Sequence, residues 1–174
     1  MGSMGKVLPV NLIVGMIFRD KELCIRAEKI LKKRFGELNF ESRIMNFDHT
    51  DYYEKEMGNN LRRKFISFKR LIKPERLAGI KRFSNSLETR FSLSGRRRIN
   101  LDPGYLDANK LVLATTKDWG HRIYLKEGIY AEVTLYFQDN SFQSREWTYP
   151  DYKTEEYIHI FNHLRKQYLE KDLT

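Results

Sequence analysis

Polar side chains that could bind or transform a ligand are concentrated between residues 96 and 137. Two segments there alternate polar with apolar residues, and the polar positions are Arg96, Arg98, Asn100 and Asp102 in the first and Tyr130, Glu132, Thr134 and Tyr136 in the second. Because successive side chains of a strand point to opposite faces, each set is expected on one face of a sheet. Arginine, tyrosine and acid with almost no lysine favour hydrogen bonding to a specific ligand. The alternative is an ordinary solvated face of an antiparallel sheet.

These residue types predict a pocket for an anion. Arg98 and Arg122 are expected to grip the anion, and Glu132 and Asp102 to orient it or to hold a metal, with Glu132 also a candidate catalytic residue. The other expected ligand-binding residues are Asn100, Lys117, Asp118 and Tyr130. His49 or His121 is the candidate for proton transfer near neutral pH. Lys117, Asp118, His121 and Arg122 surround a turn at residues 119–120, where surface electrostatics is the alternative explanation.

A third group of candidates lies in residues 47–58, directly after an expected strand. Asp48, His49 and Asp51 have donors suited to a divalent metal such as Mg, Mn or Zn, which makes such an ion a possible cofactor. The alternative is helix capping by Thr50 or Asp51, with Glu54 in the first turn.

An aromatic group follows near residue 150. Trp147, Tyr149, Asp151 and Tyr152 surround Pro150. They could form an aromatic wall with one carboxylate at the end of the sheet. Packing against the last helix would require the same aromatic residues.

The elements that must position these residues follow from the periodicity of the chain. Strands are expected at residues 8–18, 41–47, 96–101, 111–116, 121–125, 129–137 and 141–147. Helices are expected at residues 21–35, with Asp20 as N-cap, and at 60–71, 74–91 and 154–169. The first helix separates two strands that could pair in parallel as a β-α-β unit. Asp102-Pro103-Gly104 is interpreted as a turn that ends a strand.

The composition is that of a folded and basic protein. The 174 residues are 41% hydrophobic, and 32 basic against 23 acidic residues give a net charge of +9. Basic clusters interleaved with phenylalanine, as at residues 62–70, could follow a nucleic acid. The same pattern fits a helix that exposes its basic face. Any nucleic-acid affinity is expected to be weak, nonspecific and strongly dependent on salt.

The length predicts a single α+β domain over residues 6–174, with a mainly antiparallel sheet flanked by helices and an N-terminal β-α-β unit. Residues 1–5 are interpreted as a cloning remnant. The single Cys24 excludes an internal disulfide, and no apolar run approaches the roughly 20 residues that span a bilayer. We therefore expect a cytoplasmic protein without a membrane partner.

Five segments carry a resemblance to a known family: FDHTDYYEKEMG, GRRRINLDPGYL, KLVLATTKD, HRIYLKEGIYAEVTL and WTYPDY, in this order. The chain resembles the bacterial family called domain of unknown function 4416 over nearly its whole length. The resemblance implies no established activity. Some members are labelled GTP-binding proteins, but this sequence has no G-x-x-x-x-G-K-[ST] loop, and residues 115–118 (TTKD) match a guanine-reading element only superficially.

The function that these patterns favour is binding of a phosphorylated or nucleotide-like small anion, with or without chemistry on it. A nonspecific nucleic-acid-binding protein and a non-catalytic scaffold or sensor remain the alternatives. In the scaffold, the polar sheet face would be an internal network of salt bridges.

Overall fold

Strand β1 (Asn11–Phe18) lies at the centre of the sheet, and all of its residues are buried. A nearly continuous apolar run is typical of a strand that is covered on both faces. β1 pairs antiparallel with β4 (Arg62–Phe68) on one side and with β5 (Ile99–Leu106) on the other. The computed structural model describes residues 2–3 and 5–171 of the chain.

The remaining strands extend this sheet. They are β2 (Leu38–Glu41), β3 (Met45–Asn46), β6 (Lys110–Thr115), β7 (Ile123–Lys126), β8 (Ile129–Gln138) and β9 (Ser141–Ser144). Within the described residues, nine strands follow the order β2-β4-β1-β5-β6-β8-β7, with β3 beside β4 and β9 beside β8. The strand pairs of the described residues are antiparallel. The predicted α+β class with a mainly antiparallel sheet is therefore confirmed.

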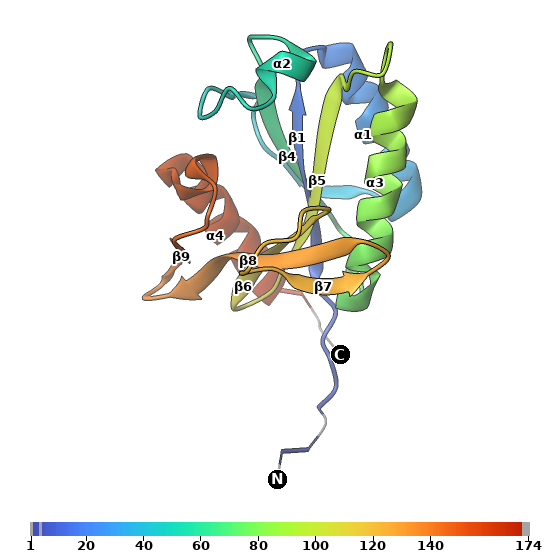
Figure 1. Cartoon of the computed structure of the whole chain (residues 1–174). Coiled ribbons are helices and arrows are strands. Elements are labelled where there is room, and N and C mark those ends of the chain that lie inside the picture. The colour runs from blue at the N-terminus through green and yellow to red at the C-terminus, as the bar shows by residue number, and fades with distance from the viewer. Residues whose placement is uncertain (1, 4, 172–174) are drawn as a thin grey trace.

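Helices cover both faces of the sheet. They are α1 (Lys21–Phe35), the short α2 (Glu54–Met57), α3 (Leu77–Phe91) and α4 (Glu155–Leu169). α1 and α3 share one apolar core with β1, β4 and β5, whereas α4 packs on the opposite face (Figure 1). No helix of the described residues is long and apolar enough to cross a membrane.

The three long helices begin close to where the sequence predicts. The Asp20 carboxylate accepts hydrogen bonds from the amides of Glu22 and Leu23 and so caps α1. A 3₁₀ turn at Pro74–Arg76 leads into α3, and the Thr154 hydroxyl caps α4.

The N-terminal β-α-β unit is of the split kind. β1 and β2 both run antiparallel to β4, which lies between them, so they point in the same direction without touching. The direct pairing of the two strands that flank α1 was therefore wrongly expected. The strand expected at residues 41–47 is replaced by β2 and β3, which both pair with β4.

The helix predicted at residues 60–71 is wrong, because these residues form β4. Phe65 packs in the core on the α4 face, whereas Ile66 and Phe68 pack in the core beneath α1 and α3. A segment that buries large side chains on two opposite faces fits a central strand. The spacing of residues 65, 68 and 71, which matches one side of a helix, is coincidental here.

The sheet opens between β5 and β6, and this opening positions the site. The pairing of β6 with β5 ends at Gly104, so residues 99–103 of β5 have β1 as their strand neighbour and not β6. Pro103 lies at the point of departure and has no backbone N–H to give a second strand. A Cβ on Gly104 would lie 2.4 Å from the Val112 carbonyl oxygen, so β6 crosses too close for any other residue. The turn predicted at residues 102–104 is therefore wrong, since the segment continues the strand.

Two side chains of α3 replace the missing strand along the open edge of β5. The Leu101 carbonyl oxygen accepts a hydrogen bond from Lys81 Nζ at 3.0 Å, and the Leu101 amide donates to Glu88 Oε1 at 2.6 Å. A buried strand edge is thus satisfied without a further strand.

Candidate functional site

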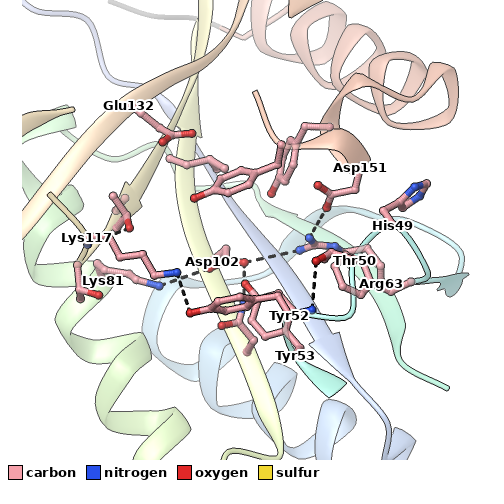
Figure 2. A pocket seen from close by; sticks show the side chains of 18 of the residues that line it. His49, Thr50, Tyr52, Tyr53, Arg63, Lys81, Asp102, Lys117, Glu132 and Asp151 are labelled. Carbon is pink, nitrogen blue, oxygen red and sulfur yellow. Dashed lines mark hydrogen bonds and ion pairs between the residues drawn. The ribbon is translucent and has the colours of Figure 1, made fainter. Parts of the chain in front are cut away.

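A cavity of about 610 Å³ opens where β6 leaves β5. This volume is in the range of small-molecule sites. Figure 2 shows side chains converging on it from the loop after β3, from β4, β5, α3 and β8, and from the segment before α4. Its charged lining residues are Arg63, Lys81, Glu88, Arg97, Asp102, Lys117, Glu132 and Asp151.

Arg63 of β4 forms a deeply buried part of the lining. Its side chain is only 3% exposed, and Nη2 donates to Asp151 Oδ2 at 2.6 Å. Its guanidinium also lies over the rings of Phe47, Phe65 and Tyr152, at 5.0, 5.3 and 5.6 Å from the ring centres. A cation can be buried here because a carboxylate and several aromatic faces surround it.

Three buried polar atoms at this position have no hydrogen-bond partner among the described residues. They are Nε and Nη1 of Arg63 and the Tyr152 hydroxyl oxygen. Nη1 and this hydroxyl both face Gly15 of β1, where a Cβ would lie 2.9 and 3.2 Å from them. Burial raises the pKa of Tyr152 well above its ordinary value, so the hydroxyl stays protonated and can donate a hydrogen bond. Unsatisfied donors are rare in native proteins, so this cradle requires an acceptor.

α3 contributes one face of the cavity through residues spaced by four and three. Lys81, Asn85 and Glu88 lie on the same side of this helix and all line the cavity. Burial raises the pKa of the Glu88 carboxyl to about 7, although Lys81 and the Leu101 amide act to lower it. Glu88 is therefore the lining carboxyl that exchanges a proton near neutral pH.

β5 carries a chain of polar contacts along the cavity. Asn100 Nδ2 donates to Asp102 Oδ2 at 2.6 Å, and Asn100 Oδ1 accepts from Arg97 Nη1 at 2.9 Å. Arg97 in turn binds Glu56, whose pKa is lowered by hydrogen bonds from the guanidinium. Lys81 Nζ and Arg63 Nη1 lie 3.5 and 3.7 Å from the Asp102 carboxylate.

The mouth of the cavity is formed by two loops. Lys117, which follows β6, donates to the Tyr52 hydroxyl at 2.8 Å and lies over the Tyr52 ring. Lys117 forms no ion pair within the part of the chain that the structure describes. Its ammonium group is thus available to an incoming anion.

Glu132 lines the cavity but is held by its own partners. The Glu132 side chain is 1% exposed and that of Arg122 is 5% exposed, and Glu132 Oε2 accepts from Arg122 Nε at 2.8 Å. His121 Nε2 lies 3.3 Å from the same oxygen, and Thr134 donates to Oε1 at 3.2 Å. Arg122 also donates to the Lys117 carbonyl and to the Tyr149 hydroxyl. This group therefore fastens the two sides of the mouth to β8.

The structure brings part of the expected site together. The expected residues that line the cavity are His49, Asn100, Asp102, Lys117 and Glu132. Tyr149, Asp151 and Tyr152 of the aromatic group also line it. The polar face of β5 thus has the predicted phase at residues 100 and 102.

The two arginines expected to grip an anion do not line the cavity. Arg98 precedes β5, is exposed and donates to Asp20 at 2.9 Å, so the strand alternation does not extend to it. Arg122 lies behind Glu132, with all three of its nitrogens engaged. The expected pocket shared by Arg98, Arg122 and Glu132 is therefore wrong.

Three further expected residues lie outside the cavity. His121 stacks on Trp147 with ring centres 5.1 Å apart, and Tyr130 packs edge-on against Tyr124. Asp118 is exposed in the turn before β7. These positions do not bring them to a shared ligand.

The loop expected to bind a metal does not gather its ligands. Asp48 and Asp51 are exposed, and the Asp48 carboxylate is 4.0 Å from His49 Nε2. Among the described residues, no group of three or more His, Cys, Asp and Glu could hold a metal ion. Capping is not the role either, because α2 begins after Tyr53 without a side-chain cap, while Thr50 accepts from the Tyr52 amide within the loop.

Several lining residues were missed by sequence reasoning, chiefly Arg63, Lys81, Glu88 and Arg97. Arg63, Phe65 and Ser67 alternate along one side of β4, a period-two pattern that a helix assignment conceals. The spacing of Lys81, Asn85 and Glu88 within the expected helix would have predicted a polar stripe. No local signal shows that Arg97, rather than Arg98, turns inward.

The fold and the cavity together define an α+β protein with a charged cavity at a split in its sheet. The chain matches the model of the family described as Domain of unknown function (DUF4416) over residues 8–168 and therefore belongs to that family. The resemblance carried by the five segments is confirmed. No match was found among curated proteins or among solved structures.

Proposed function

We propose that the cavity binds a small phosphorylated or nucleotide-like anion. The observation that carries this proposal is the pair of buried donors near Gly15, Arg63 Nη1 and the Tyr152 hydroxyl, which have no hydrogen-bond partner among the described residues. A phosphate or carboxylate oxygen can accept hydrogen bonds from both a guanidinium and a phenol hydroxyl. The ammonium group of Lys117 at the mouth, which donates to the Tyr52 hydroxyl but forms no ion pair among the described residues, adds a second attractive contact.

The aromatic lining supports a ligand that also carries a ring. Tyr52, Tyr53 and Tyr149 present their rings or hydroxyls at the cavity, and Phe47 lies deeper. Stacking on such rings is favourable for any flat heterocycle. The polar and aromatic surfaces are thus combined as a nucleotide-like molecule requires.

The basic surface gives less support to a nucleic-acid partner. Arg63 and Arg97 point into the cavity, and Arg98 is paired with Asp20. Lys64 is held by Glu28 and Glu41. These basic residues therefore do not form one continuous exposed surface. Weak nonspecific binding of nucleic acid stays a prediction.

The test is calorimetric titration with AMP, 3′,5′-cyclic AMP and inorganic phosphate, with adenosine as the uncharged comparison. We expect the anions to bind and adenosine to bind at least about tenfold more weakly, because a hydrogen bond to a charged group contributes roughly 1.5 kcal/mol or more. Absence of binding by all three anions would overturn the proposal.

Two matched variants locate the binding. Tyr152 and Tyr157 both have a buried hydroxyl without a partner in the described part of the chain, but of the two Tyr152 alone lines the cavity. Tyr152→Phe should weaken anion binding by about tenfold, whereas Tyr157→Phe should leave it within about twofold. Equal effects of the two substitutions would place the ligand elsewhere.

A further inference from the structure

With all of its lining carboxyl groups ionised, the cavity would be balanced in charge before any ligand enters. Four basic residues line it, Arg63, Lys81, Arg97 and Lys117, and four acidic residues, Glu88, Asp102, Glu132 and Asp151. The nearest partners outside the lining, Arg122 for Glu132 and Glu56 for Arg97, add one charge of each sign. Binding of an anion therefore gives the cavity an excess negative charge. In a partly dry site such a charge is unfavourable unless a compensating positive charge binds with the anion.

Three of the four lining carboxylates have close hydrogen-bond or ion-pair partners. Asp151 is 2.6 Å from Arg63, and Glu132 is 2.8 Å from Arg122. Asp102 accepts from Asn100 and lies near Lys81 and Arg63.

Glu88 differs from these three carboxylates. One of its oxygens accepts from the Leu101 amide, a bond that a neutral carboxyl group can also accept. The other oxygen is 3.7 Å from Arg97 Nη1, its one ion pair within the described residues. The charged groups that face Glu88 are Lys81 on its own helix, Arg97 on the segment before β5 and Asp102 on β5. This carboxyl therefore loses least when it becomes neutral.

We propose that the cavity takes up one proton together with a singly charged anion, and that this proton resides on Glu88. The inference rests on the proposed function. The Glu88 carboxyl, with its pKa raised by burial to about 7, is already close to half protonated at neutral pH. An anion close by disfavours the ionised form further and so raises the affinity of Glu88 for a proton. By linkage, the proton raises the affinity for the anion by the same factor.

The test uses 3′,5′-cyclic AMP, whose single charge does not change between pH 6 and 9. Titrations in two buffers of different ionisation enthalpy measure the protons taken up on binding. We expect uptake of about 0.5 proton per ligand at pH 7 and about 0.9 at pH 8, because less of the free protein carries the proton at the higher pH. Above pH 8 the affinity should fall by about tenfold per pH unit.

The variant Glu88→Gln tests whether the proton resides on this residue. The glutamine oxygen can still accept a hydrogen bond from the Leu101 amide, but the side chain carries no charge and takes up no proton. In this variant we expect no proton uptake and an affinity that is constant from pH 6 to pH 9. At pH 8.5 it should bind about 30-fold more tightly than the unsubstituted protein. Uptake that persists in this variant would overturn the assignment.

The two proposals fail in different ways. If cyclic AMP binds the unsubstituted protein at pH 6 with no exchange of protons at pH 7 and 8, the coupling is refuted and the proposed function stands. If cyclic AMP, AMP and phosphate all fail to bind at pH 6, both proposals fall. The buffer comparison needs no variant, so it holds even if Glu88→Gln does not fold.

Discussion

Substitution of Glu132 by glutamine should destabilise the protein strongly. Glu132 and Arg122 are almost fully buried and joined by a contact of 2.8 Å, so the carboxylate is the main counter-charge of this guanidinium. In Glu132→Gln the amide oxygen can still accept from Arg122 Nε, but the charge of Arg122 is left uncompensated. Breaking a buried ion pair from one side costs roughly 3 to 5 kcal/mol.

The lower end of that range is expected here. Arg122 keeps its hydrogen bonds to the Lys117 carbonyl and the Tyr149 hydroxyl, at 3.1 and 2.8 Å. The net loss should therefore be about 3 kcal/mol, because charge is lost while the hydrogen bonds are largely kept. For a chain of this size such a loss lowers the thermal midpoint by about 6 to 12 °C.

Urea unfolding and thermal melting at pH 7 measure the loss. Glu127→Gln is the matched control, because Glu127 also pairs with an arginine, Arg82 of α3, but both side chains are exposed. An exposed pair contributes within about 1 kcal/mol, so this control should barely change the midpoint. A loss in Glu132→Gln no larger than in the control would refute a structural role for the Arg122 pair.

Two further substitutions test the opening in the sheet. Gly104→Ala should lose about 3 kcal/mol or more in urea unfolding, because its Cβ would lie 2.4 Å from the Val112 carbonyl oxygen. Gly120→Ala, with open space around it, should change stability by less than about 0.5 kcal/mol. Since the folded pKa of Glu88 is raised from 4.5 to about 7, its stabilising contribution is present below pH 4.5 and is lost as the pH rises through 7. Relative to the unsubstituted protein, Glu88→Gln should thus gain up to about 3 kcal/mol between pH 5 and pH 8, and an unchanged difference would contradict the raised pKa.

The long helices were predictable because local signals agree with their packing. Asp20 caps α1 through its side chain, and the residues of α1 that periodicity places on one face, such as Leu23, Ala27 and Leu31, are the buried ones. β6, β8 and β9 were also placed to within three residues, because their buried apolar residues mark them as strands.

β4 could not be assigned in this way, because its partners are distant in sequence. α4 covers one face of β4 and the core beneath α1 and α3 covers the other, so apolar side chains on both faces mask the period-two pattern. Arg63 made the helical interpretation more attractive, since an arginine is expected to be solvated. Its burial depends on Asp151 and Tyr152, which lie almost ninety residues away in the chain.

The site itself was half predictable, for a reason that lies in the split of the sheet. Alternation along β5 correctly placed Asn100 and Asp102 on the polar face, because strand geometry is local. It could not show that β6 departs at Gly104, since that depends on how closely a second strand crosses the first. The roles of Lys81 and Glu88 follow from this departure alone.

The same opening separates structural side chains from those available to a ligand. Lys81 and Glu88 satisfy the backbone of Leu101, and the Glu132–Arg122 pair fastens the mouth. Removal of these contacts would leave a strand edge or a buried charge without a partner, so these side chains have a structural role. Arg63 Nη1 forms no hydrogen bond among the described residues and lies 3.7 Å from Asp102 Oδ2, while Nη2 anchors the guanidinium to Asp151. A ligand oxygen near Gly15 would thus accept a hydrogen bond from Nη1 without breaking a hydrogen bond that the fold requires.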